Sequence, residues 1–152
     1  MTPSIFDSLG DKPKMAEMVG WEFIANDKDA RTVSLSFVAS ELFSNPMGYV
    51  HGGFLSTMLD ETMGSALVAT TDAEFFGTTI SMTTDFCRPA FCGKIFAEGR
   101  VTTMGKSVAF LEGTLTDDKG KLIARSTASY KLHPFVRPEK KTAASAAEAV
   151  DA

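Results

Sequence analysis

A glycine pair at the start of a helical pattern is the first feature that could do chemistry. Gly52 and Gly53 stand where a polar, turn-prone loop gives way to helical spacing. Backbone N–H groups at such a position are exposed at the positive end of the helix dipole. They can hold a carbonyl oxygen as it gains negative charge. A glycine pair can also serve only to make a tight loop-to-helix turn, and the motif alone leaves both interpretations open.

A carboxylate is the second such feature. Asp60 follows on the same helical pattern, with apolar neighbours and Gly64 beside it. A carboxylate in these surroundings can act as a general base or as a nucleophile. A lone helix carboxylate is more often a partly solvated charge. Glu61 lies on the other edge of the apolar stripe, and the phase of the pattern does not choose between the two acids.

The spacing of these two features has a geometric consequence. Eight residues of α-helix separate Gly52 from Asp60 by ~12 Å. Groups that act on one carbonyl carbon must lie within roughly 3 Å of the reacting atoms. If both residues are catalytic, one must come from another copy of the chain. An antiparallel pairing of two helices about a two-fold axis meets this need twice over, so the spacing predicts an active site in a dimer interface.

Composition argues against several other classes of function. The chain has 152 residues, of which 44% are hydrophobic and 22% charged, as in one globular domain with a sizeable core. Its net charge of -4 and the lack of a dense Lys/Arg cluster argue against nucleic acid. With two histidines and two cysteines, the chain has little from which to build a metal site, and we expect no metal or cofactor. No apolar run approaches the roughly 20 residues of a membrane span, so we expect a cytoplasmic protein that does not bind membranes.

Hydrophobic periodicity predicts one α+β domain over residues 1–133. One long helix is expected at about 52–70, and its apolar stripe is wider than a surface helix needs. A shorter helical segment is expected at about 4–20. Stretches with a period of two predict strands at 21–25, 33–38, 79–86, 94–103, 107–116 and 122–132. We therefore expect an antiparallel sheet of five to six strands wrapped around the helix, followed by a flexible tail at 134–152.

Five motifs occur in a specific order and spacing, although each one alone is weak. They are Asn45-Pro-Met-Gly-Tyr-Val-His-Gly-Gly53, Leu59-Asp60, Gly77-Thr-Thr-Ile-Ser-Met82, Phe86-Cys-Arg-Pro-Ala90 and Gly120-Lys-Leu-Ile-Ala124. Together they resemble the PaaI-type acyl-CoA thioesterases of the hotdog fold, and the resemblance covers about residues 18–133. It implies a sheet wrapped around a central helix, a homodimer with one continuous sheet, and pairing of dimers into a homotetramer.

The resemblance also implies a reaction and roles for four residues. The reaction is hydrolysis of an acyl-CoA to a free acid and CoA, without metal or cofactor. Asp60 would activate water or attack the thioester, and the N–H of Gly52 would polarise the thioester carbonyl with the help of Asn45. Thr79 would orient the water beside Asp60 of its own chain. Asn45 and Gly52 would come from the opposing chain.

Further residues are expected to line the substrate site. Tyr49, Phe75 and Phe76 flank the proposed site and are candidates for an apolar acyl pocket, with aliphatic and aromatic acyl groups both left open. Gly53 completes the glycine pair. His51 is expected to fix the turn with its imidazole rather than to act as a base.

Three cations are candidates for contact with the phosphates of CoA. Arg88, Lys106 and Arg125 could serve because a long anionic ligand on an acidic protein needs local positive charge. For each of them, an ordinary surface charge is at least as good an interpretation.

Two other functions compete with hydrolysis. Hotdog hydratases and dehydratases use a histidine with an acid on the helix, but the spacing of His51 and Asp60 fits the thioesterase pattern better. A non-catalytic acyl-CoA sensor is the other alternative. Such a sensor would lack the carboxylate or carry a DNA-binding segment, whereas this chain keeps Asp60 and shows no such segment.

Overall fold

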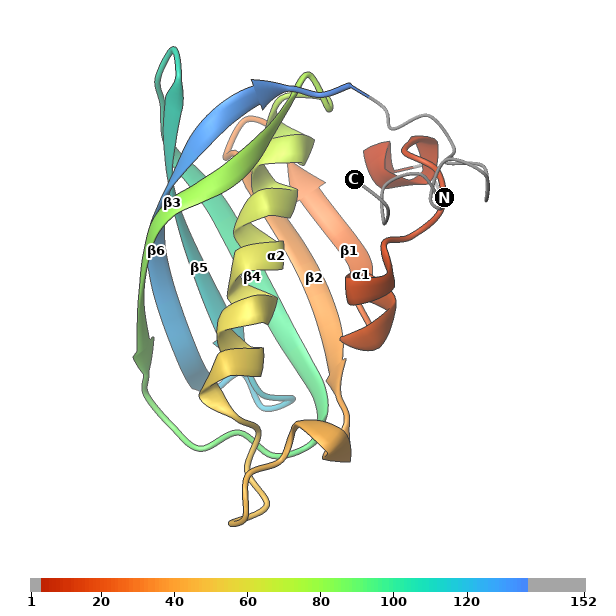
Figure 1. Ribbon diagram of the computed structural model, residues 1–152, viewed down its shortest axis with the longest axis vertical. Coiled ribbons are helices and arrows are strands. Elements are labelled where there is room, and N and C mark those ends of the chain that lie inside the picture. Colours follow the sequence, from red (N-terminus) through yellow and green to blue (C-terminus); the bar gives the residue numbers. More distant parts are fainter. Residues whose placement is uncertain (1–3, 137–152) are drawn as a thin grey trace, which may run out of the picture.

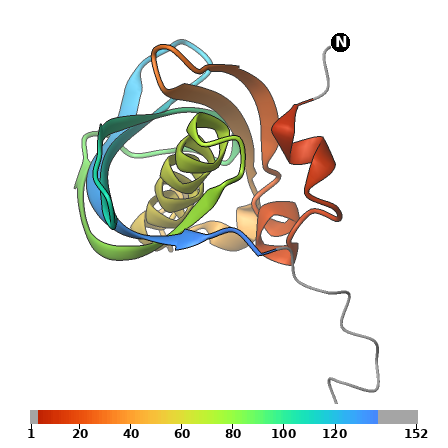
Figure 2. The same ribbon diagram turned by 90° about the horizontal axis from the view of Figure 1, so that it is seen from above.

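One long helix, α2 (Gly52–Thr70), lies against the concave face of a six-stranded antiparallel sheet (Figure 1). The computed structural model describes residues 4–136. Seen from above in Figure 2, the sheet curves around α2. The predicted fold class, an antiparallel sheet wrapped around one long helix, is confirmed. Most of the predicted tail, from residue 137 onward, lies outside the described residues.

The strand order places β3 at one edge of the sheet, although it is third in the chain. The order is β1-β2-β4-β5-β6-β3, and all neighbouring pairs are antiparallel. Among the described residues β3 pairs only with β6, so its other edge carries unpaired backbone groups. The strands are β1 (Glu22–Asp27), β2 (Thr32–Ala39), β3 (Phe75–Phe86), β4 (Gly93–Met104), β5 (Val108–Thr116) and β6 (Leu122–Pro134).

The helix packs directly on the middle of the sheet because two strands carry glycines there. A Cβ added at Gly99 of β4 would lie 2.7 Å from the carbonyl oxygen of Thr62. One added at Gly113 of β5 would lie 3.2 Å from the Met63 side chain. Each large side chain that α2 buries fully contributes about 1.5–3 kcal/mol to folding. Those with no exposed surface are Met58, Leu59, Met63 and Leu67.

The N-terminal segment closes the side of the helix next to β1. It forms a 3-10 turn, η1 (Ile5–Ser8), and a short helix, α1 (Lys14–Met18). The Trp21 indole follows α1 and donates a hydrogen bond to Ser65 Oγ of α2 at 3.3 Å. The Phe6 ring packs edge-on against Trp21, with 5.1 Å between ring centroids. A second 3-10 turn, η2 (Glu41–Phe43), leads into the loop before α2.

Strand β3 starts four residues earlier than its alternation pattern predicts and contains a bulge. It begins at Phe75 instead of Thr79. In the pairing with β6, Thr79 lies opposite Tyr130 and Ser81 opposite Ser129, so Ile80 has no partner. The extra residue shifts the phase of the strand, because successive strand residues face opposite sides. As a result Thr79 and Met82 both face α2.

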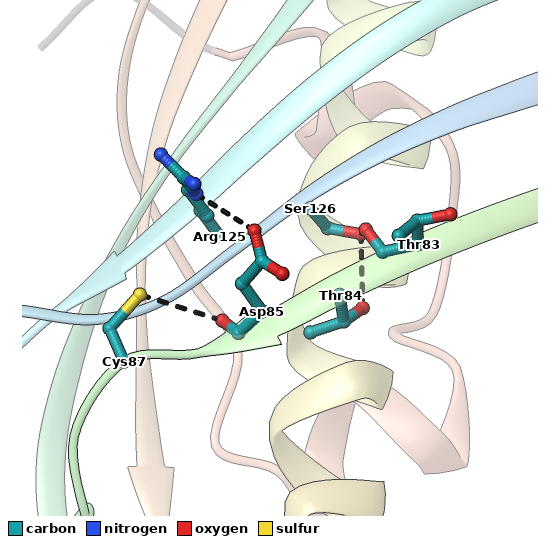
Figure 3. Close-up of polar contacts among 6 residues, drawn as sticks. All are labelled: Thr83, Thr84, Asp85, Cys87, Arg125 and Ser126. Carbon is teal, nitrogen blue, oxygen red and sulfur yellow. Dashed lines mark hydrogen bonds and ion pairs between the residues drawn. The ribbon is translucent and has the colours of Figure 1, made fainter.

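Polar contacts lock the second half of β3 to β6 (Figure 3). Arg125 Nε donates to Asp85 Oδ2 at 3.0 Å, and Ser126 Oγ donates to the Thr83 carbonyl at 2.8 Å. Thr84 Oγ1 and Ser126 Oγ lie 3.1 Å apart. Past the bulge, the register is therefore fixed by side chains as well as by the backbone ladder.

Candidate active site

The Asp60 carboxylate lies partway along α2, where the helix contacts β3 and β6. Thr79 Oγ1 donates a hydrogen bond to Asp60 Oδ1 at 2.7 Å, and Tyr130 Oη donates to the same oxygen at 2.5 Å. Thr79 and Tyr130 lie opposite each other in the β3–β6 pairing. The strand register therefore delivers two hydroxyl groups to one carboxylate oxygen. The structure brings Asp60 and Thr79 of one chain together, as the family resemblance implies.

Tyr130 is the residue of this cluster that sequence reasoning missed. In the alternation of the predicted strand at 122–132, Tyr130 shares a face with Ala128 and Leu132, which indicates only a core residue. One signal could have found it: Tyr130 is an aromatic hydroxyl among small and aliphatic inward residues, and a buried tyrosine hydroxyl needs a polar partner.

The two neighbouring acids of α2 have different surroundings. Both Asp60 and Glu61 are half-buried. Burial, and then the negative charge of Asp60, raise the pKa of Glu61. Burial also raises the pKa of the Tyr130 hydroxyl, reinforced by its hydrogen bond to Asp60, so it stays protonated at neutral pH. Among residues 4–136, side chains of other elements donate hydrogen bonds to Asp60 but none does so to Glu61.

The start of α2 forms the second part of the candidate site. The N–H groups of Gly52 and Gly53 have no acceptor among the described residues. A Cβ added at Gly52 would lie 3.1 Å from the Phe86 ring, so the absence of a side chain leaves room for that ring. At Gly53 an added Cβ would meet nothing within 4 Å. The glycine pair therefore presents free donors, with Phe86 on one side and open space on the other.

Asn45 and His51 both stabilise the loop before α2, but His51 does so through its backbone and not through the imidazole that the sequence suggests. Asn45 Oδ1 accepts hydrogen bonds from the N–H groups of Met47 at 2.9 Å and Tyr49 at 3.1 Å. The backbone N–H of His51 donates to the Phe43 carbonyl at 2.8 Å. The His51 side chain is exposed and its imidazole makes no hydrogen bond among the described residues. The turn is thus fixed by the Asn45 amide and the backbone instead of by the imidazole.

Two adjoining cavities open beside the start of α2. One, of about 430 Å³, is lined by Asn45, Gly52 and Phe86 among others. The other, of about 550 Å³, shares Tyr49 and Arg88 with the first. The larger cavity also carries cations and acids from β4 and from the β5–β6 turn. These residues, which sequence reasoning did not select, are Lys94, Asp117, Asp118, Lys119 and Lys121.

The remaining predicted residues do not line either cavity within one chain. Phe75 and Phe76 begin β3 beside the C-terminal end of α2, and Phe76 stacks on His133 with 5.2 Å between ring centroids. Lys106 lies in the β4–β5 turn, at the end of the molecule opposite the start of α2 (Figure 1). Arg125 pairs with Asp85 on the surface. Within one chain, the Asn45–Gly52 end of the site is separate from Asp60 and Thr79.

Comparison with known proteins identifies the family. A family model described as the Thioesterase superfamily matches residues 47–124, a stretch that runs from the loop before α2 into β6. A candidate thioesterase from Ralstonia eutropha JMP134, described as related to phenylacetic acid degradation, is 30% identical. Its structure superposes with a TM-score of 0.78 over 85% of this chain and 99% of its own. The chain therefore belongs to the Thioesterase superfamily.

A curated relative agrees with this assignment, and a further solved structure shares the fold. A candidate esterase of Saccharolobus solfataricus is 31% identical over 92 residues, which is 60% of this chain and 65% of its own length. The structure of smu.793 from Streptococcus mutans, bound to acetyl CoA, shares the fold at 17% identity. It has a TM-score of 0.68 and covers 76% of this chain and 90% of its own. The resemblance to PaaI-type thioesterases is confirmed, and the protein is a hydrolase of the thioesterase class.

No helix within residues 4–136 is long and apolar enough to cross a membrane. The same residues contain no group of three or more His, Cys, Asp or Glu side chains that could hold a metal ion.

Proposed function

We propose that this protein hydrolyses acyl-CoA thioesters to a free acid and CoA, at sites shared between two copies of the chain. The observation that carries the proposal is the Asp60 carboxylate, held through Oδ1 by two hydroxyl groups while no described residue donates to Oδ2. A base that is oriented in this way can activate water, which is what hydrolysis of a thioester requires. The free N–H groups at the start of α2 supply the complementary function of an oxyanion site.

The shared site rests on the separation of these two parts. The site needs Gly52 and Asp60 together, and one straight helix keeps them ~12 Å apart. The unpaired edge of β3 lies next to the Asp60 cluster and carries exposed Ile80 and Phe86. Antiparallel pairing of this edge with a second copy would continue the sheet and complete two equivalent sites. We propose a homodimer built in this way, with dimers paired into a homotetramer.

In the proposed reaction, Asp60 Oδ2 takes a proton from a water molecule as the water oxygen bonds to the thioester carbon. The negative charge that develops on the carbonyl oxygen is held by the N–H of Gly52 of the second copy, with Asn45 nearby. The tetrahedral intermediate then collapses, the carbon–sulfur bond breaks, and the CoA thiolate takes the proton from Asp60. In the alternative course an Asp60 oxygen attacks the thioester carbon and the CoA thiolate leaves as the carbon–sulfur bond breaks. Water then hydrolyses the resulting anhydride, which releases the free acid and regenerates the Asp60 carboxylate.

The cavities beside Gly52 give room and charge for the CoA part of the substrate. Arg88 lies where the two cavities meet, and Lys94, Lys119 and Lys121 line the larger one. Asp117 and Asp118 line the same cavity, so its four cations leave a net positive charge there. A local excess of positive charge suits the phosphates of CoA on a protein whose net charge is -4. The acetyl CoA bound by the Streptococcus mutans neighbour supports this substrate class.

Replacement of Asp60 by asparagine tests the proposal. Asp60→Asn keeps the size of the side chain but cannot take up the proton, so we expect kcat with a panel of acyl-CoAs to fall by roughly 100- to 10,000-fold. Glu61→Gln, at the neighbouring position on α2, is the matched control and should retain kcat within about three-fold. Size-exclusion chromatography should show the same oligomer for all three proteins.

Three results would contradict the proposal. Wild-type turnover by Asp60→Asn would remove Asp60 from the mechanism. Binding of acyl-CoA without release of free thiol by the wild-type protein would indicate a sensor. Hydration of an enoyl-CoA, without hydrolysis of the thioester, would indicate a hydratase.

A further inference from the structure

We infer that Tyr130 is a positioning residue for the thioesterase reaction, holding Asp60 Oδ1 so that Oδ2 is the oxygen left to act on water. The inference rests on the proposed function, in which Asp60 is the base or nucleophile. Tyr130 acts through Asp60 and makes no contact with the substrate.

Among residues 4–136, the acceptors of the Tyr130 hydroxyl are both on Asp60. Its oxygen lies 2.5 Å from Oδ1 and 2.9 Å from the carbonyl oxygen of the same residue. A tyrosine has one hydroxyl proton, and the shorter distance, together with the charge of the acceptor, favours the carboxylate. Thr79 donates to the same Oδ1 from the paired position on β3. Two donors from two strands thus fix the torsion angle of one carboxylate.

The Tyr130 ring is held in a slot made by glycines. The side chain is only 2% exposed. A Cβ added at Gly77 of β3 would lie 2.5 Å from Tyr130 Cδ2, and one added at Gly64 of α2 would lie 3.9 Å from Cε2. The ring therefore fills the space that these two elements leave. Because the ring cannot shift, its hydroxyl is delivered to one point, which is the carboxylate.

A purely structural role does not explain this arrangement. A phenylalanine would fill the same slot without the cost of burying a hydroxyl group. The tyrosine instead carries its hydroxyl to a charged group that belongs to the candidate site. The difference between the two side chains is one oxygen atom, so Tyr130→Phe isolates the positioning role.

Steady-state kinetics of Tyr130→Phe with an acyl-CoA that the wild type hydrolyses tests the inference. We expect kcat to fall roughly 10- to 100-fold, the range for a misplaced catalytic group, with KM changed by less than about two-fold. Thr62→Val is the matched control, since it removes a buried α2 hydroxyl whose one acceptor among the described residues is the Met58 carbonyl, at 2.6 Å. It should keep kcat within about two-fold. Assays are run under solution conditions in which urea titration shows that every protein is folded.

Two double variants separate positioning from a general loss of order. In an Asp60→Asn background, Tyr130→Phe should leave the residual rate unchanged, because Tyr130 acts only through the carboxylate. Combined with Thr79→Val, it should lose less than the product of the single losses, because both hydroxyls hold the same oxygen and the loss of either one already releases the carboxylate. If Tyr130→Phe does not fold, Tyr130→Met fills the slot without a hydroxyl and takes its place.

The outcomes distinguish this inference from the proposed function. Wild-type kcat in Tyr130→Phe, or an equal fall in the Asp60→Asn background, overturns the positioning role and leaves acyl-CoA hydrolysis standing. A wild-type protein that does not hydrolyse any acyl-CoA removes the proposed function and this role with it. A selective fall in kcat that depends on Asp60 supports both.

Discussion

Asp60 and Glu61 are adjacent on α2, yet their surroundings give them different properties. Asp60 receives hydroxyl groups from two strands, which offset the cost of placing a charge at a half-buried position. Glu61 is placed beside that charge without such donors among the described residues, so burial and repulsion raise its pKa. The negative charge of Glu61 therefore opposes folding at neutral pH.

Glu61→Gln should stabilise the protein at neutral pH but not in acid. A raised pKa means that the folded state binds the Glu61 proton more tightly than the unfolded state does. Its contribution to stability is then full below the ordinary value of 4.5 and is lost as the pH rises through the higher folded value. We expect Glu61→Gln to gain up to about 1 kcal/mol at pH 7, the range for partly exposed charges. The gain should vanish near pH 4.

Urea titration of both proteins at pH 4 and pH 7 measures this difference. Glu74→Gln, at an exposed acid in the turn before β3, is the matched control and should show no such dependence. A Glu61→Gln protein that is less stable than the wild type at pH 7 would show that the carboxylate has a stabilising partner instead.

At the level of single residues, the sequence identifies some members of the candidate site and not others. Gly52 and Asp60 stand out from residue type and spacing alone. Thr79 emerges only from the family resemblance, because strand periodicity does not distinguish it from its threonine neighbours. Periodicity does not identify Tyr130 as a site residue, because it predicts that the side chain faces inward but not which group its hydroxyl contacts. The cations of the larger cavity come from the loop after β3, from β4 and from the β5–β6 turn, which only the fold brings together.

At the level of elements, the bulge in β3 explains why the alternation of side chains along the sequence predicts the faces of this strand only in part. A strict period of two would place Thr79 and Met82 on opposite faces of the sheet. The unpaired Ile80 lets both face the helix, so Thr79 reaches Asp60 while Met82 still packs on the core. The predicted ranges of the other five strands end within two residues of the observed ones, although β1, β4 and β6 also contain register shifts, at Ile24, Thr102 and Ile123.

Gly99 of β4 should be intolerant of a side chain, because it is where the sheet touches the helix backbone. The Cβ of Gly99→Ala would meet the Thr62 carbonyl oxygen at 2.7 Å, and a backbone atom cannot turn aside. We expect a loss of about 1–3 kcal/mol, as for other overpacked cores. Thermal unfolding should show a fall in Tm of roughly 2–4 °C for each kcal/mol lost.

Gly53→Ala is the matched control for this prediction. An added Cβ there meets nothing within 4 Å, and alanine favours the helical conformation more than glycine. Its Tm should equal or exceed that of the wild type. A Gly99→Ala protein as stable as Gly53→Ala would mean that α2 can move away from the sheet at little cost.

At the level of the whole molecule, the fold was more predictable than the site. One helix with a wide apolar stripe and several alternating strands can bury their apolar faces only against one another, and this constrains the architecture. The site depends on the Asp60 cluster and the start of α2, which one chain keeps apart. In the proposed dimer, a second copy of the chain completes each site by pairing with the unpaired edge of β3.

Hybrid dimers should recover activity from two inactive proteins if each site draws on both chains. Asp60→Asn removes the base, and Gly52→Val places a branched side chain against the Phe86 ring and obstructs the helix start. In a dimer of one chain of each kind, one site carries both defects and the other carries neither. Equal mixing makes about half of the dimers hybrid, so about a quarter of wild-type activity should return.

Differently tagged chains, purified through both tags, would demonstrate that subunits have exchanged. Mixing two tagged forms of Asp60→Asn should restore nothing, and a hybrid as inactive as its parents would show that each chain carries its own complete site.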